Sequence, residues 1–230
     1  PKTCQQFPFL LVATPSGVTL GPEGGAHQSI YSPLIGMGQP GLTYFEPAWA
    51  DELALVMRWA FQHLQDPDGG SVYLRLTTRA IPQIARDGDA WEADMLKGGY
   101  WLKPPGPDAE AAIVFTGALA PEVLAAYEEL AADIPGLGVL NVTAPGLLHR
   151  GWSARQAARW REGARAPSHV ETLLSALPAH AGLVTVIDGS PATLSWLGGV
   201  RGMPVSPLGA DHFGPTGDLP DLYRLNRLDA

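Results

Sequence analysis

The chain has 230 residues, of which 46% are hydrophobic and 17% charged, a composition typical of globular proteins rather than disordered or fibrous ones. Its formal net charge of −8 at pH 7 argues against a nucleic-acid or anionic membrane surface, because both need clustered basic side chains. No apolar run approaches the roughly 18 residues that would predict a membrane span. The single cysteine, Cys4, excludes an intramolecular disulfide and indicates a reducing, cytoplasmic setting.

The first half of the chain alternates short apolar runs with one amphipathic stretch. Strands are expected at residues 7–14, 42–45 and 71–77, each rich in β-forming side chains. A helix is expected from Pro47 to about residue 64, because apolar side chains recur there at helical spacing. Its first turns carry Asp51 and Glu52, where the helix dipole favours anions.

The composition changes between Ala80 and Pro107, where apolar runs become scarce. Three prolines within residues 104–107 favour an extended connector between two domains. The sequence therefore predicts one domain over residues 1–102 and a second over residues 103–230.

The second half again alternates strands and helices, which indicates an α/β fold with a mainly parallel sheet covered on both faces. Strands are expected at residues 111–116, 139–143 and 183–187, and helices at residues 121–133, 191–197 and 219–223. Ser153 with Gln156, and Ser168 with Glu171, have capping-box spacing and predict two further helix starts. Thr216 is expected to cap the last helix.

The stretch from Glu23 to Ser29 is the most unusual in the chain. Two consecutive glycines, Gly24 and Gly25, allow a ligand to approach the backbone closely. Glu23 and His27 lie four residues apart, and a loop imidazole can donate a hydrogen bond to a carbonyl or shuttle a proton. A turn whose histidine merely bonds a neighbouring carbonyl explains the same residues, so spacing alone leaves both interpretations open.

Other polar residues favour structural roles. His149, His169 and His180 share no metal-ligand spacing, so no metal site is expected. Residues 188–191, Asp-Gly-Ser-Pro, lack the glycine spacing and the lysine of a nucleotide-binding loop. We therefore expect that turn to be structural.

The segment Glu23–Ser29 is similar to the acidic-Gly-x-x-His-Gln motif of transketolase-like pyrimidine-binding domains. Longer stretches resemble the homodimeric pyruvate dehydrogenase decarboxylating component even more closely, and they occur in the family's order. They cover residues 19–29, 45–48, 51–53 and 73–79 in the first half, and 186–191, 195–198, 208–214 and 221–224 in the second. The resemblance implies two open, mainly parallel sheets with helices on both faces: part of a pyrimidine-binding domain, then a transketolase-like C-terminal domain.

The resemblance also assigns roles to a few side chains. His27 matches the histidine that stabilises substrate oxygens near the reactive carbon of thiamine diphosphate. Glu23 and Gln28 flank it as substrate-side residues, or they stabilise the loop. Arg79 lies where transketolases place an arginine near the substrate phosphate, although an ion pair at a subunit boundary is an alternative for it.

Departures from the family pattern limit what this chain does alone. Residues 15–17, Pro-Ser-Gly, replace the His-Asp-Ser of transketolases, which favours a 2-oxo acid over a sugar phosphate. The Gly-Asp-Gly segment with a later Asn, by which the family holds Mg2+ and the diphosphate, is missing from these residues, as is the glutamate that activates the cofactor. We therefore expect thiamine diphosphate and Mg2+ to bind only in the complete enzyme. The chain starts at a proline, which fits a fragment or a processed product.

The first functional hypothesis is thus part of a pyruvate dehydrogenase decarboxylating component, an oxidoreductase that passes an acyl unit to lipoyl groups. Its expected partners are the remaining N-terminal part or subunit, a second copy in a homodimer, and a lipoyl-bearing acyltransferase. The isolated chain is expected to be inactive. Two alternatives remain: a transketolase acting on sugar phosphates, and a non-catalytic assembly or regulatory module.

Overall fold

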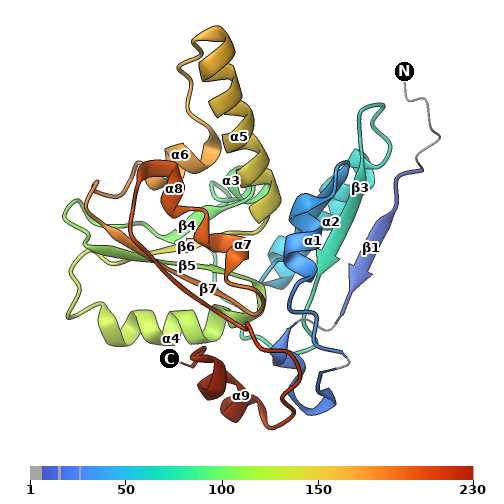
Figure 1. Ribbon diagram of the computed structural model, residues 1–230, viewed down its shortest axis with the longest axis vertical. Helices are drawn as coiled ribbons and strands as arrows, with labels where there is room; N and C mark the ends of the chain where they lie inside the picture. The colour runs from blue at the N-terminus through green and yellow to red at the C-terminus, as the bar shows by residue number, and fades with distance from the viewer. Residues whose placement is uncertain (1–6, 15–16, 26, 230) are drawn as a thin grey trace.

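The computed structural model describes residues 7–14, 17–25 and 27–229, so the prediction about Cys4 lies outside the described residues. The chain folds as an α/β protein with two sheets, one of three strands and one of five, as Figure 1 shows. This arrangement confirms the predicted fold class. None of the described helices is both long and apolar enough to cross a membrane.

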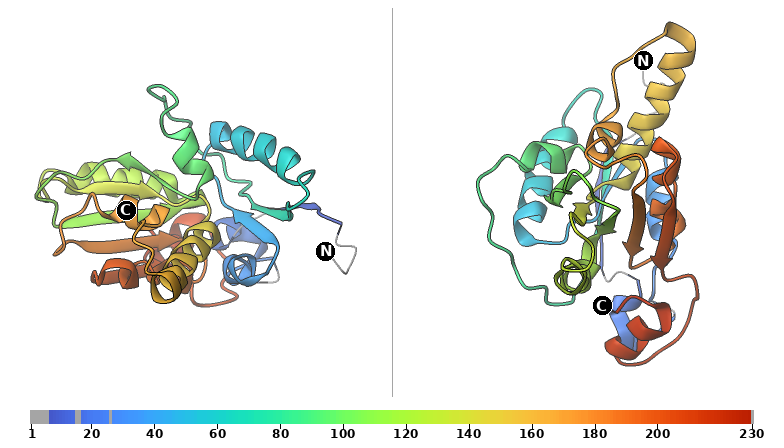
Figure 2. Two further views of the ribbon diagram at one scale, coloured as in Figure 1. Left: turned by 90° about the horizontal axis from the view of Figure 1, so that it is seen from above. Right: turned by 90° about the vertical axis from the view of Figure 1, so that its left-hand side faces the viewer.

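The first sheet is small and entirely parallel. Its strands are β1 (Leu10–Ala13), β3 (Ser71–Arg75) and β2 (Leu42–Phe45), in that spatial order. Helices α1 (Ser32–Gly38) and α2 (Ala50–His63) lie on opposite faces of this sheet in Figure 2. Phe45, Val56 and Leu74 are fully buried between the sheet and α2. Strand β1 forms one edge.

The second sheet has the order β4-β6-β5-β7-β8. The strands are β4 (Tyr100–Lys103), β5 (Ala111–Thr116), β6 (Gly138–Asn141), β7 (Gly182–Ile187) and β8 (Val205–Gly209). All pairs are parallel except β4 with β6, which is antiparallel at one edge. Each parallel strand except the last is followed by helical segments that return the chain to the start of another strand, as βαβ connections require.

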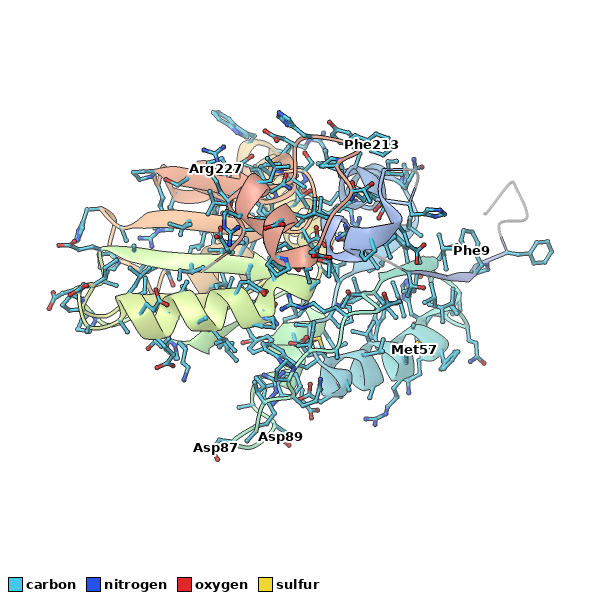
Figure 3. The ribbon with its side chains drawn as sticks, turned by 90° about the horizontal axis from the view of Figure 1, so that it is seen from below. Phe9, Met57, Asp87, Asp89, Phe213 and Arg227 are labelled. Atoms are coloured by element: carbon cyan, nitrogen blue, oxygen red, sulfur yellow. The ribbon has the colours of Figure 1, made fainter. Side chains whose placement is uncertain are left out.

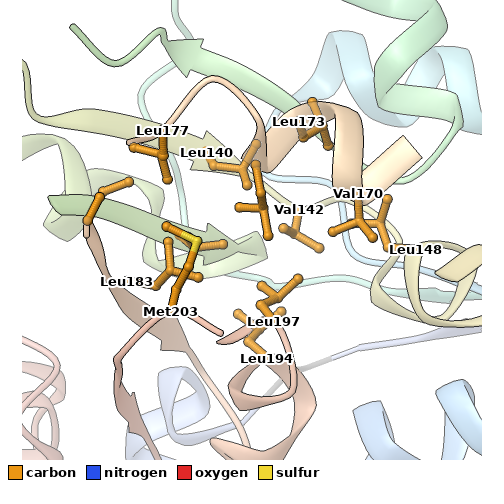
Figure 4. Packing of buried hydrophobic residues seen from close by; sticks show 14 of the residues in the cluster. Leu140, Val142, Leu148, Val170, Leu173, Leu177, Leu183, Leu194, Leu197 and Met203 are labelled. Atoms are coloured by element: carbon orange, nitrogen blue, oxygen red, sulfur yellow. The ribbon is translucent and has the colours of Figure 1, made fainter. Parts of the chain in front are cut away.

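Both faces of the second sheet are covered. The covering elements are η2 (Gly117–Leu119), α4 (Ala120–Leu130), α5 (Pro145–Glu162), α6 (His169–Leu174), α7 (Ala192–Ser195), α8 (Gly198–Arg201) and α9 (Leu219–Asn226). One core cluster, shown in Figure 4, packs Leu148 of α5 and Leu194 of α7 against Leu140. The other packs Val123 of α4 and Tyr223 of α9 against Phe115.

An irregular segment, residues 76–99, links the two sheets and contains α3 (Glu92–Leu96). Arg86 fixes it, because its guanidinium lies 4.0 Å from the ring centroid of Trp91 and pairs with Asp51 at 2.7 Å. Asp87 and Asp89 mark its projecting tip in Figure 3. The chain therefore changes sheet between β3 and β4. Since β4 pairs in the second sheet, we propose that the domain division falls within this segment rather than after residue 102.

The local predictions hold where the signal was strong. The capping box of Ser168 is confirmed, because its backbone N–H donates to Glu171 Oε2 at 2.7 Å and its hydroxyl accepts from Glu171 N–H. Two predicted helix starts are wrong. Ser153 lies inside α5, which begins at Pro145 where proline suits a first turn, and Asp218 rather than Thr216 precedes α9.

Candidate functional site

The glycine-rich loop lies at the carboxyl end of β1, the end at which open parallel sheets bind ligands. We call residues 17–30 the site loop; Ala26 within it lies outside the described residues. The loop begins with 3-10 turns, η1 (Val18–Glu23), interrupted at Gly21, whose φ of 34° favours glycine. The backbone N–H of His27 then donates to Gly24 O at 3.1 Å and closes a turn.

The candidate catalytic side chains of this loop face outward. Glu23 and His27 are both exposed, so the imidazole is not packed inside its own domain. Gln28, by contrast, is only 4% exposed, and its Nε2 donates to the carbonyl of Pro215 at 2.9 Å. Its Oε1 has no hydrogen-bond partner among the described residues. A carboxylate and an imidazole are thus exposed on one short turn beside a buried amide, and the catalytic role of His27 and the substrate-side roles of Glu23 and Gln28 stay predictions.

The two loop glycines are needed for contact with the second half of the chain. A methyl group at Gly24 would lie 2.1 Å from Thr216 Oγ1, and one at Gly25 would lie 2.7 Å from the Cα of Gly214. Either approach is too close for a side chain. The site loop is therefore pressed against residues 214–216, and Figure 3 shows Phe213 beside it.

Arg79 is linked to the site loop through Tyr223, whose hydroxyl is also hydrogen-bonded to Thr19 Oγ1 at 2.7 Å. Its guanidinium makes a bidentate pair with Glu122, at 2.6 and 2.8 Å, and donates to the hydroxyl of Tyr223 at 3.0 Å. The Glu122 bonds, which outweigh partial burial, raise the pKa of Arg79. In this chain Arg79 ties the linking segment to α4 and α9, and its proposed contact with substrate remains a prediction.

A buried charged cluster beside the site loop joins the two sheets. It consists of Glu46 after β2, Arg75 at the end of β3 and Asp188 after β7, each no more than 1% exposed. Arg75 Nη1 pairs with Glu46 Oε1 at 2.5 Å, and Nη2 donates to the carbonyl oxygens of Asp188 at 2.5 Å and Ser29 at 3.2 Å. The hydroxyl of Tyr44 donates a hydrogen bond to Glu46 Oε2.

Burial sets the electrostatics of this cluster. Burial raises the pKa of Glu46, partly offset by the charge of Arg75, and it raises the pKa of Asp188 in the same way. Burial, the largest single influence, lowers the pKa of Arg75, but Glu46, Tyr44 and Asp188 together outweigh burial and the pKa is raised. Arg75 therefore stays charged and is the fixed cation around which the carboxyl ends of both sheets meet.

The sequence reasoning missed this cluster. Its signal was available, because each member ends or follows an apolar strand: Phe45 precedes Glu46, Leu74 precedes Arg75 and Ile187 precedes Asp188. Charges at the carboxyl ends of parallel strands are placed to meet one another or a ligand. Which of these they do cannot be derived from one sequence, because it depends on how the two sheets face each other.

A metal ion finds no ready site here. Within residues 7–14, 17–25 and 27–229, no group of three or more His, Cys, Asp or Glu side chains is placed to hold one. The buried carboxylates beside the site loop, Glu46 and Asp188, already bind Arg75 and backbone N–H groups. The described residues therefore do not fit a bound Mg2+.

Comparisons with known proteins agree with the resemblance. No protein-family model matches the chain. Over 232 residues it is 30% identical to the pyruvate dehydrogenase E1 component of Mycolicibacterium smegmatis, covering 96% of this chain and 24% of that protein. It is 33% identical over 135 residues to the 6-deoxy-6-sulfo-D-fructose transketolase subunit SqwH of a Clostridium species, covering 57% of this chain and 38% of that subunit.

The fold points the same way. A transketolase from Pichia stipitis superposes with a TM-score of 0.68 over 96% of this chain, at 22% identity and 28% of its own length. The chain is transketolase-like. This confirms the predicted recognition, and it is consistent with a C-terminal piece of such an enzyme.

The transketolase-like chain spans about a quarter of the M. smegmatis relative and of the P. stipitis structure. A separate neighbour, described as a split gene transketolase in an inactive beta4 tetramer, is matched over 62% of its length with a TM-score of 0.63 and 19% identity. These relatives are therefore mostly much longer than this chain.

Proposed function

We propose that the transketolase-like chain is one part of a thiamine-diphosphate-dependent enzyme that decarboxylates a 2-oxo acid, pyruvate in the first instance, and passes the acyl unit to a lipoyl group. The observation that carries this proposal is the site loop itself. Glu23 and His27 are exposed at the carboxyl end of a parallel sheet, within a motif shared with the family. The match to a pyruvate dehydrogenase E1 component over nearly the whole chain supports the substrate class.

The site loop supplies positions for hydrogen bonding rather than a nucleophile. The exposed imidazole of His27 donates to a substrate oxygen as that atom gains negative charge, which is electrostatic stabilisation. Glu23 is exposed on the same turn as a substrate-side group, whereas the buried Gln28 stabilises the loop through its bond to Pro215. Thiamine diphosphate, when bound by the complete enzyme, supplies the carbon that accepts the acyl unit.

A 2-oxo acid is favoured over a sugar phosphate by what Arg79 does. A phosphate-binding arginine needs free donors, whereas the two terminal nitrogens of Arg79 already bond Glu122, and one of them also bonds Tyr223. Ketol transfer between sugar phosphates remains the second candidate, because SqwH is 33% identical and is named a transketolase subunit.

The first sheet offers a surface for the rest of the enzyme. Leu11 and Val12 of the edge strand β1 are 47% and 49% exposed, and Phe9 projects from its start in Figure 3. A groove of about 820 Å3 lies at the amino ends of the strands of this sheet, and its lining includes Phe9, Leu42 and Arg150. Exposed apolar edges favour strand pairing. We propose that the remaining N-terminal part or subunit covers this edge and groove.

Arg150 indicates the charge of that partner. Its guanidinium is half-buried, donates to the carbonyl of Leu42 at 3.3 Å, and has no carboxylate partner among the described residues. Burial lowers its pKa. A partner that brings a carboxylate to Arg150 removes this cost, so we expect one there. Homodimerisation, a lipoyl-bearing acyltransferase and a cytoplasmic setting complete the proposal by analogy with the family.

Two assays test the proposal. The intact enzyme, this chain together with the polypeptide that completes it, is supplied with thiamine diphosphate and Mg2+. One assay contains pyruvate with a lipoyl acceptor, and the other contains a ketose phosphate with an aldose phosphate acceptor. We expect carbon dioxide release from pyruvate; activity on the sugar alone would reverse the order of the two candidates.

Calorimetry of the isolated chain with thiamine diphosphate and Mg2+ should show no tight binding. Saturable binding by this chain alone would contradict the view that the cofactor is held by the rest of the enzyme.

A further inference from the structure

The turn Asp188–Ser190, at the carboxyl end of β7, holds both ends of the site loop. At the first end, the carboxylate of Asp188 accepts hydrogen bonds from the backbone N–H groups of Val18, at 2.7 Å, and Thr19, at 3.1 Å. At the other end, the N–H of Ser190 donates to Ile30 O at 2.9 Å. The segment between these points carries Glu23, His27 and Gln28.

Arg75 couples the same turn to the first sheet. One Nη2 group donates to both the carbonyl of Asp188 and the carbonyl of Ser29. Glu46 fixes the guanidinium through the other terminal nitrogen, Nη1. Arg75, at the end of β3, thereby links the end of the site loop to the turn that follows β7. A bond to a charged group at this degree of burial is stronger and more directional than one between neutral groups.

The site loop and the turn approach each other so closely that a side chain larger than that of glycine meets neighbouring atoms at Gly17 and Gly189. Gly17 opens the loop with a φ of 50°, and a methyl group there would lie 2.1 Å from Asp188 Oδ1. A methyl group at Gly189 would lie 3.1 Å from Ile30 O. Glycine at both positions allows the carboxylate to reach the loop backbone.

We propose that Asp188 is a positioning residue for the site loop, through which the five-stranded sheet sets the place of His27. The inference rests on the proposed function only in giving His27 a catalytic task. This proposal also assigns a role to the second half of the chain. Its residues position the site loop, and the site loop carries the candidate catalytic side chains. A second contact, Gln28 Nε2 to Pro215 O, fixes the middle of the loop from the same half.

The first experiment uses the chain as it stands. Amide hydrogen exchange, followed by mass spectrometry, compares wild type with Asp188→Asn, which keeps the side-chain size but removes the charge. We expect peptides covering residues 18–30 to exchange roughly 10- to 100-fold faster, the factor expected from losing hydrogen bonds to a charged acceptor. Peptides from β5 should be unchanged.

Two further variants keep this test decisive. Gly17→Ala disturbs the same contact from the loop side without changing the chemistry of any side chain in the second half, so it serves if Asp188→Asn does not fold. Glu52→Gln is the matched control. Glu52 is equally buried, but its carboxylate binds the N–H groups of Ala48 and Trp49 at the start of α2, and not the site loop.

The second readout is kinetic and separates positioning from stability. In the intact enzyme, kcat per folded molecule should fall in Asp188→Asn while Glu52→Gln, although destabilised, retains its kcat. Equal kcat values in the two variants would overturn the positioning role. Unchanged exchange of residues 18–30 in both Asp188→Asn and Gly17→Ala would also overturn it. A wild-type enzyme without thiamine-diphosphate-dependent activity would instead refute the proposed function, and the exchange result would still decide the inference.

Discussion

The two sheets of the molecule differ in how fully they are covered and in which candidate functional side chains lie beside them. The five-stranded sheet is covered on both faces, with a buried apolar cluster on each. The three-stranded sheet has a smaller cluster and an apolar edge at β1 that faces solvent. The exposed carboxylate and imidazole of the candidate site lie on the loop that follows β1 of the three-stranded sheet. The contacts that hold this loop come from Asp188 and Pro215, in the half of the chain that forms the five-stranded sheet. Reactive groups and the framework that orients them thus occupy different halves of the chain.

The contrast explains why the second half lacks a cluster of reactive side chains. A rigid, closed sheet is a good support, because packed elements hold an attached loop in place more accurately than another loop does. The open sheet, in turn, leaves room for the partner polypeptide that the proposed function requires. Five sets of substitutions probe the two halves, in descending order of expected effect on stability.

The largest effect is expected at the junction between the sheets. Arg75→Met leaves Glu46 buried without its cation, and breaking a buried pair typically costs about 3–5 kcal/mol of unfolding free energy. Urea denaturation measures this loss. The matched control is Arg58→Met on the exposed face of α2, which should change stability little. A loss of less than about 1 kcal/mol for Arg75→Met would show that the sheets are not joined through this residue.

Core truncations compare the two sheets directly. Leu140 and Leu74 are both fully buried, one in each sheet. Leu140→Ala should cost about 2–5 kcal/mol, and Leu74→Ala should lie lower in that range because the open sheet can collapse around the cavity. Denaturant midpoints of the two variants give the comparison. A larger loss for Leu74→Ala would contradict the idea that the second sheet is the more rigid support.

The capping box of α6 should contribute less. Ser168→Ala removes the side-chain acceptor for Glu171 N–H, and loss of such a cap costs about 0.5–2 kcal/mol. Thermal unfolding of the two proteins measures the difference. Thr172→Ala, four residues after Ser168, is a suitable comparison because among the described residues its hydroxyl bonds only back to the Ser168 carbonyl.

The same box predicts a pH dependence. Burial would raise the pKa of Glu171, but hydrogen bonds from Arg159 and Ser168 outweigh it and lower the pKa. A carboxylate with a lowered folded-state pKa adds stability above its ordinary pKa of about 4.3, and this stability is lost as pH falls through the lowered value. The stability difference between wild type and Glu171→Gln should therefore shrink on acidification; a gap that widens would contradict the assignment.

The smallest effect on stability is expected at the open edge. Val12→Lys on β1 replaces a side chain that is 49% exposed, so the unfolding free energy should change by no more than about 0.5 kcal/mol. Edge lysines oppose strand pairing, so self-association measured by sedimentation should decrease. In the intact enzyme the same change should weaken assembly. An unaffected assembly would mean that the partner covers another surface.

Strong periodic and β-rich signals made much of this fold predictable. Residues 42–45 and 111–116 form strands over the expected bounds, and α2 follows the apolar stripe after Pro47. Weak elements were not predicted: α1 is glycine-rich, and β4 lies between Ala80 and Pro107, where apolar runs are scarce. The start of α5 was misplaced because Ser153 and Gln156 match a cap by spacing alone, while Pro145, which begins the helix, follows a buried strand.

The residues of the site loop could be identified from the sequence, but the long-range contacts that position them could not. Glycines beside an acid and a histidine marked the site loop in the sequence. The role of Asp188 could not be derived, since it depends on a contact between residues 170 positions apart. For the same reason the ion-pair partner of Arg79, Glu122, 43 residues away, could not be identified from the sequence, and a contact of Arg79 with substrate stays a prediction.

The central claim, that this chain contributes His27 to a shared active site, is tested most directly by its kinetics in the intact enzyme. The turnover of pyruvate is compared for wild type, His27→Ala and His180→Ala, the last being an exposed histidine outside the site loop. We predict that kcat falls about 10²- to 10³-fold in His27→Ala, as for loss of one donor to a developing oxyanion. His180→Ala should match wild type. An unchanged kcat in His27→Ala would contradict the account.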